Sequence, residues 1–280
     1  MIIDAHAHAF PDKIAAGALQ TLTANARQYF HLYGEAHPHT DATTAGLTAS
    51  SRAAGIDVSL VLPIATSPKP SHTINDFAAA VDRMPGLRSF GSVHPLNPEA
   101  EAEVARVREL GLKGIKLHPE YQECFVDEPE TIAVVKAAAK EGLWVIFHAG
   151  ADIGKPPPFH CTPERVCRLR QAVPEARIIL AHMGGYRLWD EVLPRLSQMD
   201  VVLDTSYCLP NHPDQHSLFA QLIRLNGTGR VLFGTDSPWA DQGETLRTTR
   251  AFLDAYRFTL PEQQAILGGN AARILGEVPA

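Results

Sequence analysis

Short apolar runs alternate with longer amphipathic stretches along most of the chain. The runs are rich in β-branched residues and are nearly continuously apolar, which is typical of strands that are covered on both faces. These predicted strands span residues 1–8, 58–62, 88–93, 114–118, 143–148, 176–182, 201–204 and 230–236. Strands that are separated by helix-length segments indicate an α/β protein with parallel strands.

The amphipathic stretches between the runs are predicted helices. They span residues 14–26, 43–54, 75–84, 99–110, 130–141, 164–172, 188–196, 216–225 and 263–275. Gly55, Gly111 and Gly142 each follow such a helix directly, as expected where a helix ends and a short loop leads to the next strand. Before the last helix, the segment Thr259-Leu-Pro-Glu262 has the pattern of a capping box with proline in the first turn.

The strand count distinguishes between two architectures. An open, doubly wound sheet and a (β/α)8 TIM barrel would both produce this alternation, but about eight strand–helix units fit the length that a barrel needs. The first strand is not followed by the glycine-rich phosphate loop that is usual in Rossmann folds. The sequence therefore predicts a TIM barrel. Because it has no repeat, linker or low-complexity tract, residues 1–280 are expected to form a single domain.

An insertion of about thirty residues follows the first strand, roughly at positions 10–40. Its first part, 14–26, is rich in alanine and leucine and predicts a helix. Its second part contains His31, His37 and His39 and predicts a loop. Segments of this length in compact domains are often lids or binding segments, although a solvated loop fits the sequence equally well.

Composition narrows the class of protein. The chain has 280 residues with 25 Lys and Arg against 31 Asp and Glu, so it lacks the basic excess of nucleic-acid-binding proteins. Four scattered cysteines indicate a reduced environment. Neither a signal peptide nor an apolar run long enough to cross a bilayer is present, so we expect a cytoplasmic protein without a membrane partner.

Histidines at the ends of predicted strands are the main indication of chemistry. His6 and His8 alternate along the first strand, so their side chains point to the same face and could share one metal ion. Four further polar residues end apolar runs: His118, His148, His182 and Asp236. Because the carboxyl ends of barrel strands form the active-site face, these side chains are expected to converge on a metal site.

These motifs resemble the amidohydrolase superfamily, in particular its amidohydrolase-2 branch, along essentially the whole chain. The resemblance rests on Asp4-Ala-His6-Ala-His8, Gly114-Ile-Lys-Leu-His118-Pro119, Phe147-His148-Ala-Gly150, Ala181-His182-Met-Gly-Gly185, Gly234-Thr-Asp236-Ser-Pro238 and Ile266-Leu-Gly-Gly-Asn270-Ala-Ala-Arg273-Ile. It implies a distorted barrel that acts as a metal-dependent hydrolase or non-oxidative decarboxylase.

The resemblance also implies roles for individual residues. It makes His6, His8, His148 and Asp236 the metal ligands and His182 the catalytic histidine beside them. Three imidazoles and one carboxylate would leave room for a water molecule on a divalent ion. Zn²⁺ is the expected ion, although Mn²⁺, Fe²⁺ and Co²⁺ suit the same ligands. Asp236 could in addition accept a proton from that water.

The number of metal ions depends on whether the predicted strand 114–118 supplies a bridging ligand. A second ion in this superfamily usually needs a bridging ligand, often a carbamylated lysine or a glutamate. Lys116 shares a face with His118 but lies one layer deeper, and Glu120 is expected in the loop beyond the strand. One metal ion is therefore favoured. Asp4 lies on the same strand face as His6, and we expect it to orient a ligand histidine.

Four residues are candidates for substrate binding: His118, Lys116, Arg187 and Trp239. For His118, contact with the substrate or with the metal-bound water and a purely structural hydrogen bond remain alternatives. Trp239 either lines the pocket or packs beside it. A metal role for the neighbouring His160 and Cys161 is not expected, because the sequence offers them no partners.

The leading interpretation is a metal-dependent hydrolase that uses metal-activated water on a small carboxylic ester, lactone or amide. The alternative is a non-oxidative decarboxylase (a carboxy-lyase) of an aromatic or unsaturated acid, with Lys155, Arg187 and Lys116 available to hold the carboxylate. The absence of arginine at predicted strand ends favours hydrolysis. A non-catalytic metal protein is disfavoured, because structural zinc sites favour cysteine. The expected partner is a small-molecule substrate, and the sequence is compatible with a homodimer.

Overall fold

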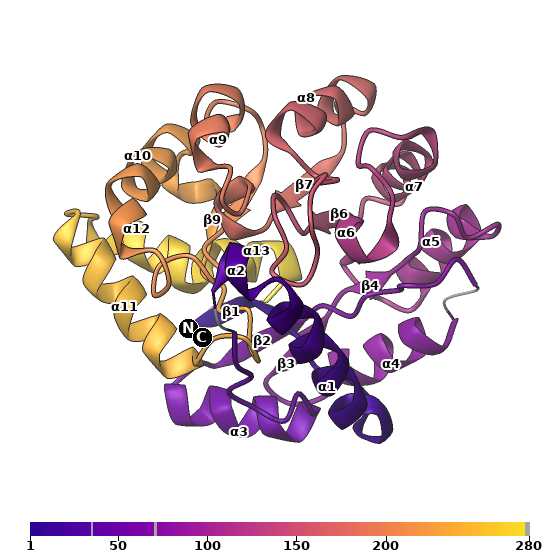
Figure 1. Cartoon of the computed structure of the whole chain (residues 1–280), viewed down its shortest axis with the longest axis horizontal. Coiled ribbons are helices and arrows are strands. Elements are labelled where there is room, and N and C mark those ends of the chain that lie inside the picture. Colours follow the sequence, from indigo (N-terminus) through magenta and orange to yellow (C-terminus); the bar gives the residue numbers. More distant parts are fainter. Residues whose placement is uncertain (35, 70–71, 278–280) are drawn as a thin grey trace.

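The computed structural model describes residues 1–34, 36–69 and 72–277, and its strands form a barrel surrounded by helices (Figure 1). The strands are β1 Ile3–Ala7, β2 Val58–Val61, β3 Leu87–Ser89, β4 Gly91–Ser92, β5 Gly114–Leu117, β6 Trp144–Phe147, β7 Arg177–Leu180, β8 Val202–Asp204 and β9 Val231–Leu232. Every pair of hydrogen-bonded neighbours is parallel. The predicted TIM barrel is confirmed.

In the described residues, nine strand segments occupy the eight strand positions of the barrel, because the predicted strand 88–93 is divided into β3 and β4. β3 pairs with β2, β4 pairs with β5, and Phe90 between them donates its backbone N–H to Val61 at 3.2 Å. The chain beyond β9 closes the barrel against β1. Ala5 donates to Phe233 at 2.8 Å, and Ala7 is bridged in parallel to Ser237. This interruption at Phe90 accounts for the distorted barrel that the family resemblance implies.

The helices form the outer ring (Figure 1). Those predicted from the sequence are α1 Asp12–Gln28, α3 Thr44–Ala54, α4 His72–Asp82, α5 Ala100–Glu109, α7 Pro129–Lys140, α8 Pro163–Ala172, α9 Trp189–Leu196 and α10 His216–Asn226. The structure adds α11 Gln242–Ala255, which the sequence did not predict. Two of its six buried positions are leucines and two are threonines, so its buried face is only weakly apolar in the sequence.

The C-terminal helix is interrupted where it passes the start of the chain. It consists of α12 Leu260–Gln264, a π-helical turn Ala265–Gly269 and α13 Asn270–Leu275, whereas the sequence predicted one helix. The predicted capping box is present, with the Thr259 backbone N–H donating to Glu262 at 2.7 Å. A Cβ on Gly268 would lie 2.3 Å from the carbonyl oxygen of Met1, so only glycine allows this approach.

Alternate residues of each strand face the helices or the barrel interior. On β6, Val145 and Phe147 belong to the cluster packed against the helices, whereas Ile146 packs inside the barrel with Ile3 and Ile179. This alternation follows from the two-residue period of a strand. The lower interior is therefore apolar, and polar side chains gather at the carboxyl ends of the strands. In the described part of the chain, no helix is long and apolar enough to cross a membrane.

The insertion lies across the face of the barrel on which the functional residues gather (Figure 1). It contains α1 and a short helix, α2 Phe30–Tyr33, in the segment that was predicted to be a loop. The insertion is tied to the chain beyond β9, because the backbone N–H of His39 donates to Pro238 at 2.7 Å. One face of α1 lines the cavity above the strand ends, as expected for a binding segment.

Candidate active site

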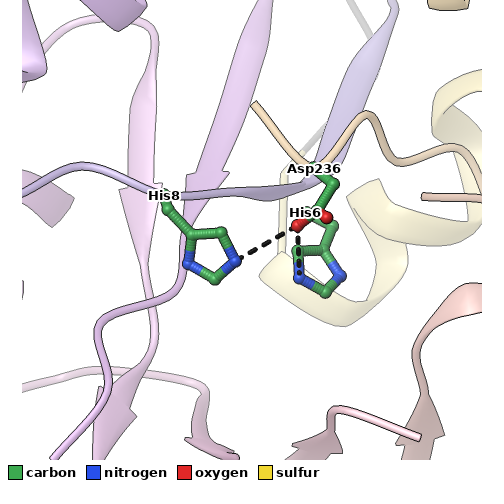
Figure 2. Close-up of side chains that lie close together, drawn as sticks. All are labelled: His6, His8 and Asp236. Carbon is green, nitrogen blue, oxygen red and sulfur yellow. Dashed lines mark ion pairs between the residues drawn. The ribbon is translucent and has the colours of Figure 1, made fainter. Parts of the chain in front are cut away.

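Three of the predicted metal ligands converge above β1 (Figure 2). The Nε2 atoms of His6 and His8 lie 3.5 Å and 3.3 Å from Oδ1 of Asp236. His6 is fully buried, and the side chains of His8 and Asp236 are 11% and 13% exposed. Two imidazole nitrogens and a carboxylate oxygen therefore face one point that is open toward the cavity.

Hydrogen bonds on the far side of each ring fix the tautomer of the two histidines. Nδ1 of His6 contacts a carboxylate oxygen of Asp204 at 2.8 Å, and Nδ1 of His8 contacts the carbonyl oxygen of Leu62 at 2.8 Å. Because these oxygens accept, each Nδ1 carries the proton and each Nε2 keeps a free lone pair. Burial lowers the pKa of His6 well below its ordinary value, and the nearby charge of Lys116 lowers it further. His6 is therefore neutral, as a ligand must be.

Asp236 is held in a strained backbone conformation. Its φ of 71° lies in the left-handed region, which is uncommon for residues other than glycine, and its N–H donates to the carbonyl oxygen of His6 at 2.8 Å. Burial acts to raise the pKa of Asp236, but interactions with the neighbouring His8, His6 and His182 outweigh it and lower the pKa overall. The carboxylate is therefore ionised beside the two imidazoles.

The structure places His148 in a neighbouring group rather than with the other three. His118, His148 and Asp152 offer ligand atoms that lie within 4.8 Å of one another. Nε2 of His118 is 3.4 Å and Nε2 of His148 is 3.8 Å from the Asp152 carboxylate, and the two rings stack at 4.2 Å. Burial lowers the pKa of both histidines well below the ordinary value. The four ligands that the resemblance implies are thus divided between two adjacent groups.

His182 lies between the two groups. Its Nε2 is 3.0 Å from Nδ1 of His148, and its ring centroid is 5.2 Å from that of His6. Its Nδ1 is 3.0 Å from the carbonyl oxygen of Ser206, which can only accept. The contact between the two histidine rings is a hydrogen bond only if one of the two nitrogens carries a proton. Nε2 of His148 is 2.9 Å from the carbonyl oxygen of Ala151, so when both rings are neutral their protons lie on the outer nitrogens and none lies between His182 and His148.

Asp4 has a different role from the one expected. Its carboxylate accepts from the backbone N–H and hydroxyl of Thr235 at 2.9 Å and 2.6 Å, and from Gln242 at 2.8 Å. It contacts the backbone of His6 but not the ring, so it joins β1 to the segment that carries Asp236. Burial raises the pKa of Asp4 to about 6, although the hydrogen bonds lower it in part. The carboxylate that orients the His6 ring is Asp204.

Lys116 reaches the metal-ligand group although it lies one layer deeper. It is fully buried inside the barrel, and its Nζ is 3.4 Å from Nε2 of His6. The long side chain spans the distance between that layer and His6. Burial lowers the pKa of Lys116 to about 8. Glu120 instead lies on the short helix α6 Pro119–Gln122, where its carboxylate contacts Nδ1 of His160 at 2.7 Å.

The remaining substrate candidates divide into residues that line the cavity and residues that do not. His118 and Trp239 line it. Arg187 is exposed and donates to the Tyr33 carbonyl oxygen at 3.2 Å, and Nζ of Lys155 is 3.4 Å from Glu123. Neither cation lines the cavity in the part of the chain that the structure describes. Arg187 instead links α2 to the barrel, with its guanidinium also 5.7 Å from the Tyr186 ring centroid.

Sequence reasoning missed two residues of the site. Asp204 ends an apolar run just as His148 does, so the same strand-end rule could have identified it. Besides His6, it binds the backbone N–H of His182 at 3.0 Å. Asp152 lies in a loop and carries no comparable signal. It is 7% exposed and lines the cavity beside His118, whose Nδ1 has no hydrogen-bond partner among residues 1–34, 36–69 and 72–277.

A cavity of about 960 Å³ joins these groups to the helices above them. Its polar floor consists of His8, His118, His148, His182 and Asp236. Its apolar wall consists of Ile14 and Leu22 on α1, Ile64 after β2, and Ile74 and Phe77 on α4. A ligand in this cavity would contact both surfaces.

The floor fits a divalent metal ion. His6 and His8 present their Nε2 atoms, Asp236 presents an ionised carboxylate, and hydrogen bonds to Asp204 and Leu62 hold both rings in place. Ligands of this type suit zinc, manganese, iron and cobalt. The adjacent group offers nitrogens of His118 and His148 and the carboxylate of Asp152 as further ligands.

A TIM barrel with histidines and an aspartate at its strand ends defines the class of metal-dependent barrel enzymes. The family comparison makes this specific, because the model of the amidohydrolase family matches residues 3–276. The chain belongs to that family and is an enzyme of the amidohydrolase superfamily. No significant match was found among curated protein sequences.

Solved structures with the same fold match the chain along almost its entire length. The 5-carboxyvanillate decarboxylase of Sphingomonas paucimobilis is 18% identical, with 99% of each chain covered and a TM-score of 0.72. The 2,6-dihydroxybenzoate decarboxylase of Rhizobium is 16% identical, with 98% of each chain covered and a TM-score of 0.69. The 5-carboxyvanillate decarboxylase of Novosphingobium aromaticivorans, complexed with manganese and 4-hydroxy-3-methoxy-5-nitrobenzoic acid, is 17% identical, covering 99% of this chain and 96% of that one, with a TM-score of 0.72.

Proposed function

We propose that the protein is a metal-dependent, non-oxidative decarboxylase of an aromatic or unsaturated carboxylic acid. The observation that carries the proposal is the match, over 98–99% of this chain, to three solved decarboxylases. The cavity supports the proposal, because tyrosines and Trp239 line it beside the floor and offer surfaces for a flat, unsaturated acid. The sequence by itself favours hydrolysis, whereas the structural relatives favour decarboxylation.

The proposed ligands are His6, His8 and Asp236, with His148 as the fourth. The metal ion is Mn²⁺ or Zn²⁺, since one matched decarboxylase contains manganese and the donor atoms suit both. When bound, such an ion supplies electrophilic polarisation of a substrate oxygen. The chain's own residues supply orientation: Asp204 and Leu62 hold the two rings, and Asp4 holds the strand that carries them against the segment of Asp236.

His182 is the proposed proton donor. In the reaction the bond between the carboxylate carbon and the adjacent carbon breaks, the electron pair remains on the adjacent carbon, and carbon dioxide leaves. That carbon then takes a proton, which a protonated His182 can supply because its ring lines the cavity floor beside His148. Ser206 and Asp204 hold the opposite side of His182 and its backbone, so the donor stays oriented.

Hydrolysis is the second candidate, and one observation favours it. Among the described lining residues the only lysine or arginine is Lys13, which is exposed, so the cavity lacks an arginine clamp for a carboxylate. In a hydrolase, Asp236 would act as the base for a water molecule that attacks an ester, lactone or amide carbonyl. Both candidates use the same floor.

Isotopes distinguish the two reactions once a substrate turns over. Screening metal-loaded protein against hydroxybenzoates, unsaturated acids, esters and lactones would supply the substrate, and turnover would then be repeated in deuterium oxide and in oxygen-18 water. We expect release of carbon dioxide and a product with deuterium at the vacated carbon. If the product contains oxygen-18 and no carbon dioxide is released, the protein is a hydrolase and the proposed decarboxylase is wrong.

A further inference from the structure

The cavity is larger than a one-ring acid needs. Its volume of about 960 Å³ lies near the top of the range of ~300–1,000 Å³ that is typical of pockets for drug-sized ligands. The matched decarboxylases are named for one-ring acids, 5-carboxyvanillate and 2,6-dihydroxybenzoate. A molecule of that size on the polar floor would leave the space between α1 and α4 unfilled.

That space is bordered by apolar side chains that the fold leaves partly exposed. Ile14 is 48% exposed, and Leu22, Ile64, Ile74 and Phe77 are each only half-buried. They come from two helices and a loop, yet they border the same cavity as His8 and His182. Apolar side chains that gather around a cleft and remain in water mark a surface that gains free energy when an apolar ligand covers it.

We propose that the substrate is an extended amphipathic acid. Its carboxylate end lies on the polar floor, and an apolar tail that extends well beyond one ring lies against the apolar wall between α1 and α4. This inference rests on the proposed decarboxylase function for the identity of the reacting group. The tail site itself rests on the cavity and on the exposed apolar side chains that border it.

Binding of a homologous series to manganese-loaded protein tests the tail site. The probes are 4-alkyl-2-hydroxybenzoates whose alkyl chain grows from one to about eight carbons, with Kd measured by calorimetry below the micellar concentration. Each added methylene is expected to lower Kd roughly three- to fourfold until the space is filled. A Kd that does not change with chain length would overturn the inference.

Gly17 provides a variant that fills the space. It lies within α1 and lines the cavity, and a Cβ built on it meets no atom within 4 Å, so a side chain there enters open space. Gly17→Phe is expected to reduce the gain per methylene, so that the longest probe loses about tenfold or more in affinity relative to the shortest. The matched control is Ala16→Phe, an exposed position on the same helix that does not line the cavity.

The control should retain the wild-type dependence of Kd on chain length. If Ala16→Phe reduces it as much as Gly17→Phe does, or if neither variant changes it, the tail does not lie against α1 and the inference is wrong. Carbon dioxide release from the same probes is measured separately. If Kd falls steeply with chain length but no carbon dioxide is released, the decarboxylase is rejected and the tail site is kept. If short acids release carbon dioxide but Kd does not change with chain length, the tail site is rejected and the decarboxylase is kept.

Discussion

The polar floor and the apolar wall of the cavity differ in how firmly their side chains are held. On the floor, the histidine rings donate hydrogen bonds to oxygens of Asp204, Leu62 and Ser206, and both His182 and Asp236 have left-handed backbone conformations. The described residues of the wall form no comparable network, and their apolar side chains remain partly exposed on α1, on α4 and in the loop after β2.

This difference suits the floor to catalysis and the wall to the selection of substrates. Groups that bind a metal ion and move a proton must stay within a few tenths of an ångström of their working positions, so strained and hydrogen-bonded residues on barrel strands suit them. A wall that selects an apolar tail needs only shape and area. Substitutions on the floor should therefore change metal content and turnover, and substitutions on the wall should change the choice of substrate.

The largest effect is expected from His8→Ala. This change removes one Nε2 ligand from a partly exposed side chain whose ring otherwise bonds, within the described residues, the carbonyl oxygen of Leu62, so the fold should survive. Metal content, measured by elemental analysis, should fall from about one divalent ion per chain to nearly none. Circular dichroism controls for folding. Wild-type protein without metal after metal-supplemented growth would reject the site, and two ions per chain would implicate Lys116 as a further ligand.

His182→Asn should separate proton transfer from metal binding. We expect turnover to fall by roughly two to four orders of magnitude, because the proton donor is removed, while the metal content stays close to that of the wild type. His148→Asn is the matched comparison, because His148 is the proposed fourth metal ligand and its ring contacts that of His182. If both variants lose metal to the same extent, His182 is itself a ligand and the proposed division of roles fails.

Asp204→Asn should weaken the floor without removing a ligand. The neutral amide cannot hold the His6 ring as the carboxylate does, so metal affinity should fall by about tenfold to a hundredfold. Competition with a chelator of known affinity measures the change. Asp190→Asn, at an exposed position of α9, is the control and should leave the affinity unaltered. Equal affinities for wild type and Asp204→Asn would show that Asp204 does not support the ligand.

The smallest effect is expected when a side chain of the apolar wall is truncated and the free energy of unfolding is measured. Ile74→Ala removes a half-buried side chain that borders open space, so the free energy of unfolding should fall by no more than about 1 kcal/mol. Ile146→Ala, at a fully buried position inside the barrel, should cost about 2–5 kcal/mol. Urea denaturation of both variants measures the difference. Similar losses would mean that the wall is packed as tightly as the core.

Much of this architecture could be predicted from local sequence. Eight strand positions follow from apolar runs, and the polar residues that end those runs, such as His118 and His182, do lie at one end of the barrel. These features depend only on the alternation of a strand and on the shared direction of parallel strands. The same reasoning missed α11, because threonines on its buried face weaken the apolar pattern.

Only the tertiary structure decided which side chains meet. Asp204 contacts His6 across 198 positions of sequence, His148 joins His118 and Asp152, and Lys116 reaches His6 from a deeper layer. The apolar wall likewise exists because α1 and α4 face each other across a cavity. Such contacts depend on barrel closure and on side-chain rotamers. The local pattern of residues encodes the direction in which a strand or helix presents a side chain, but not the distance to its partner.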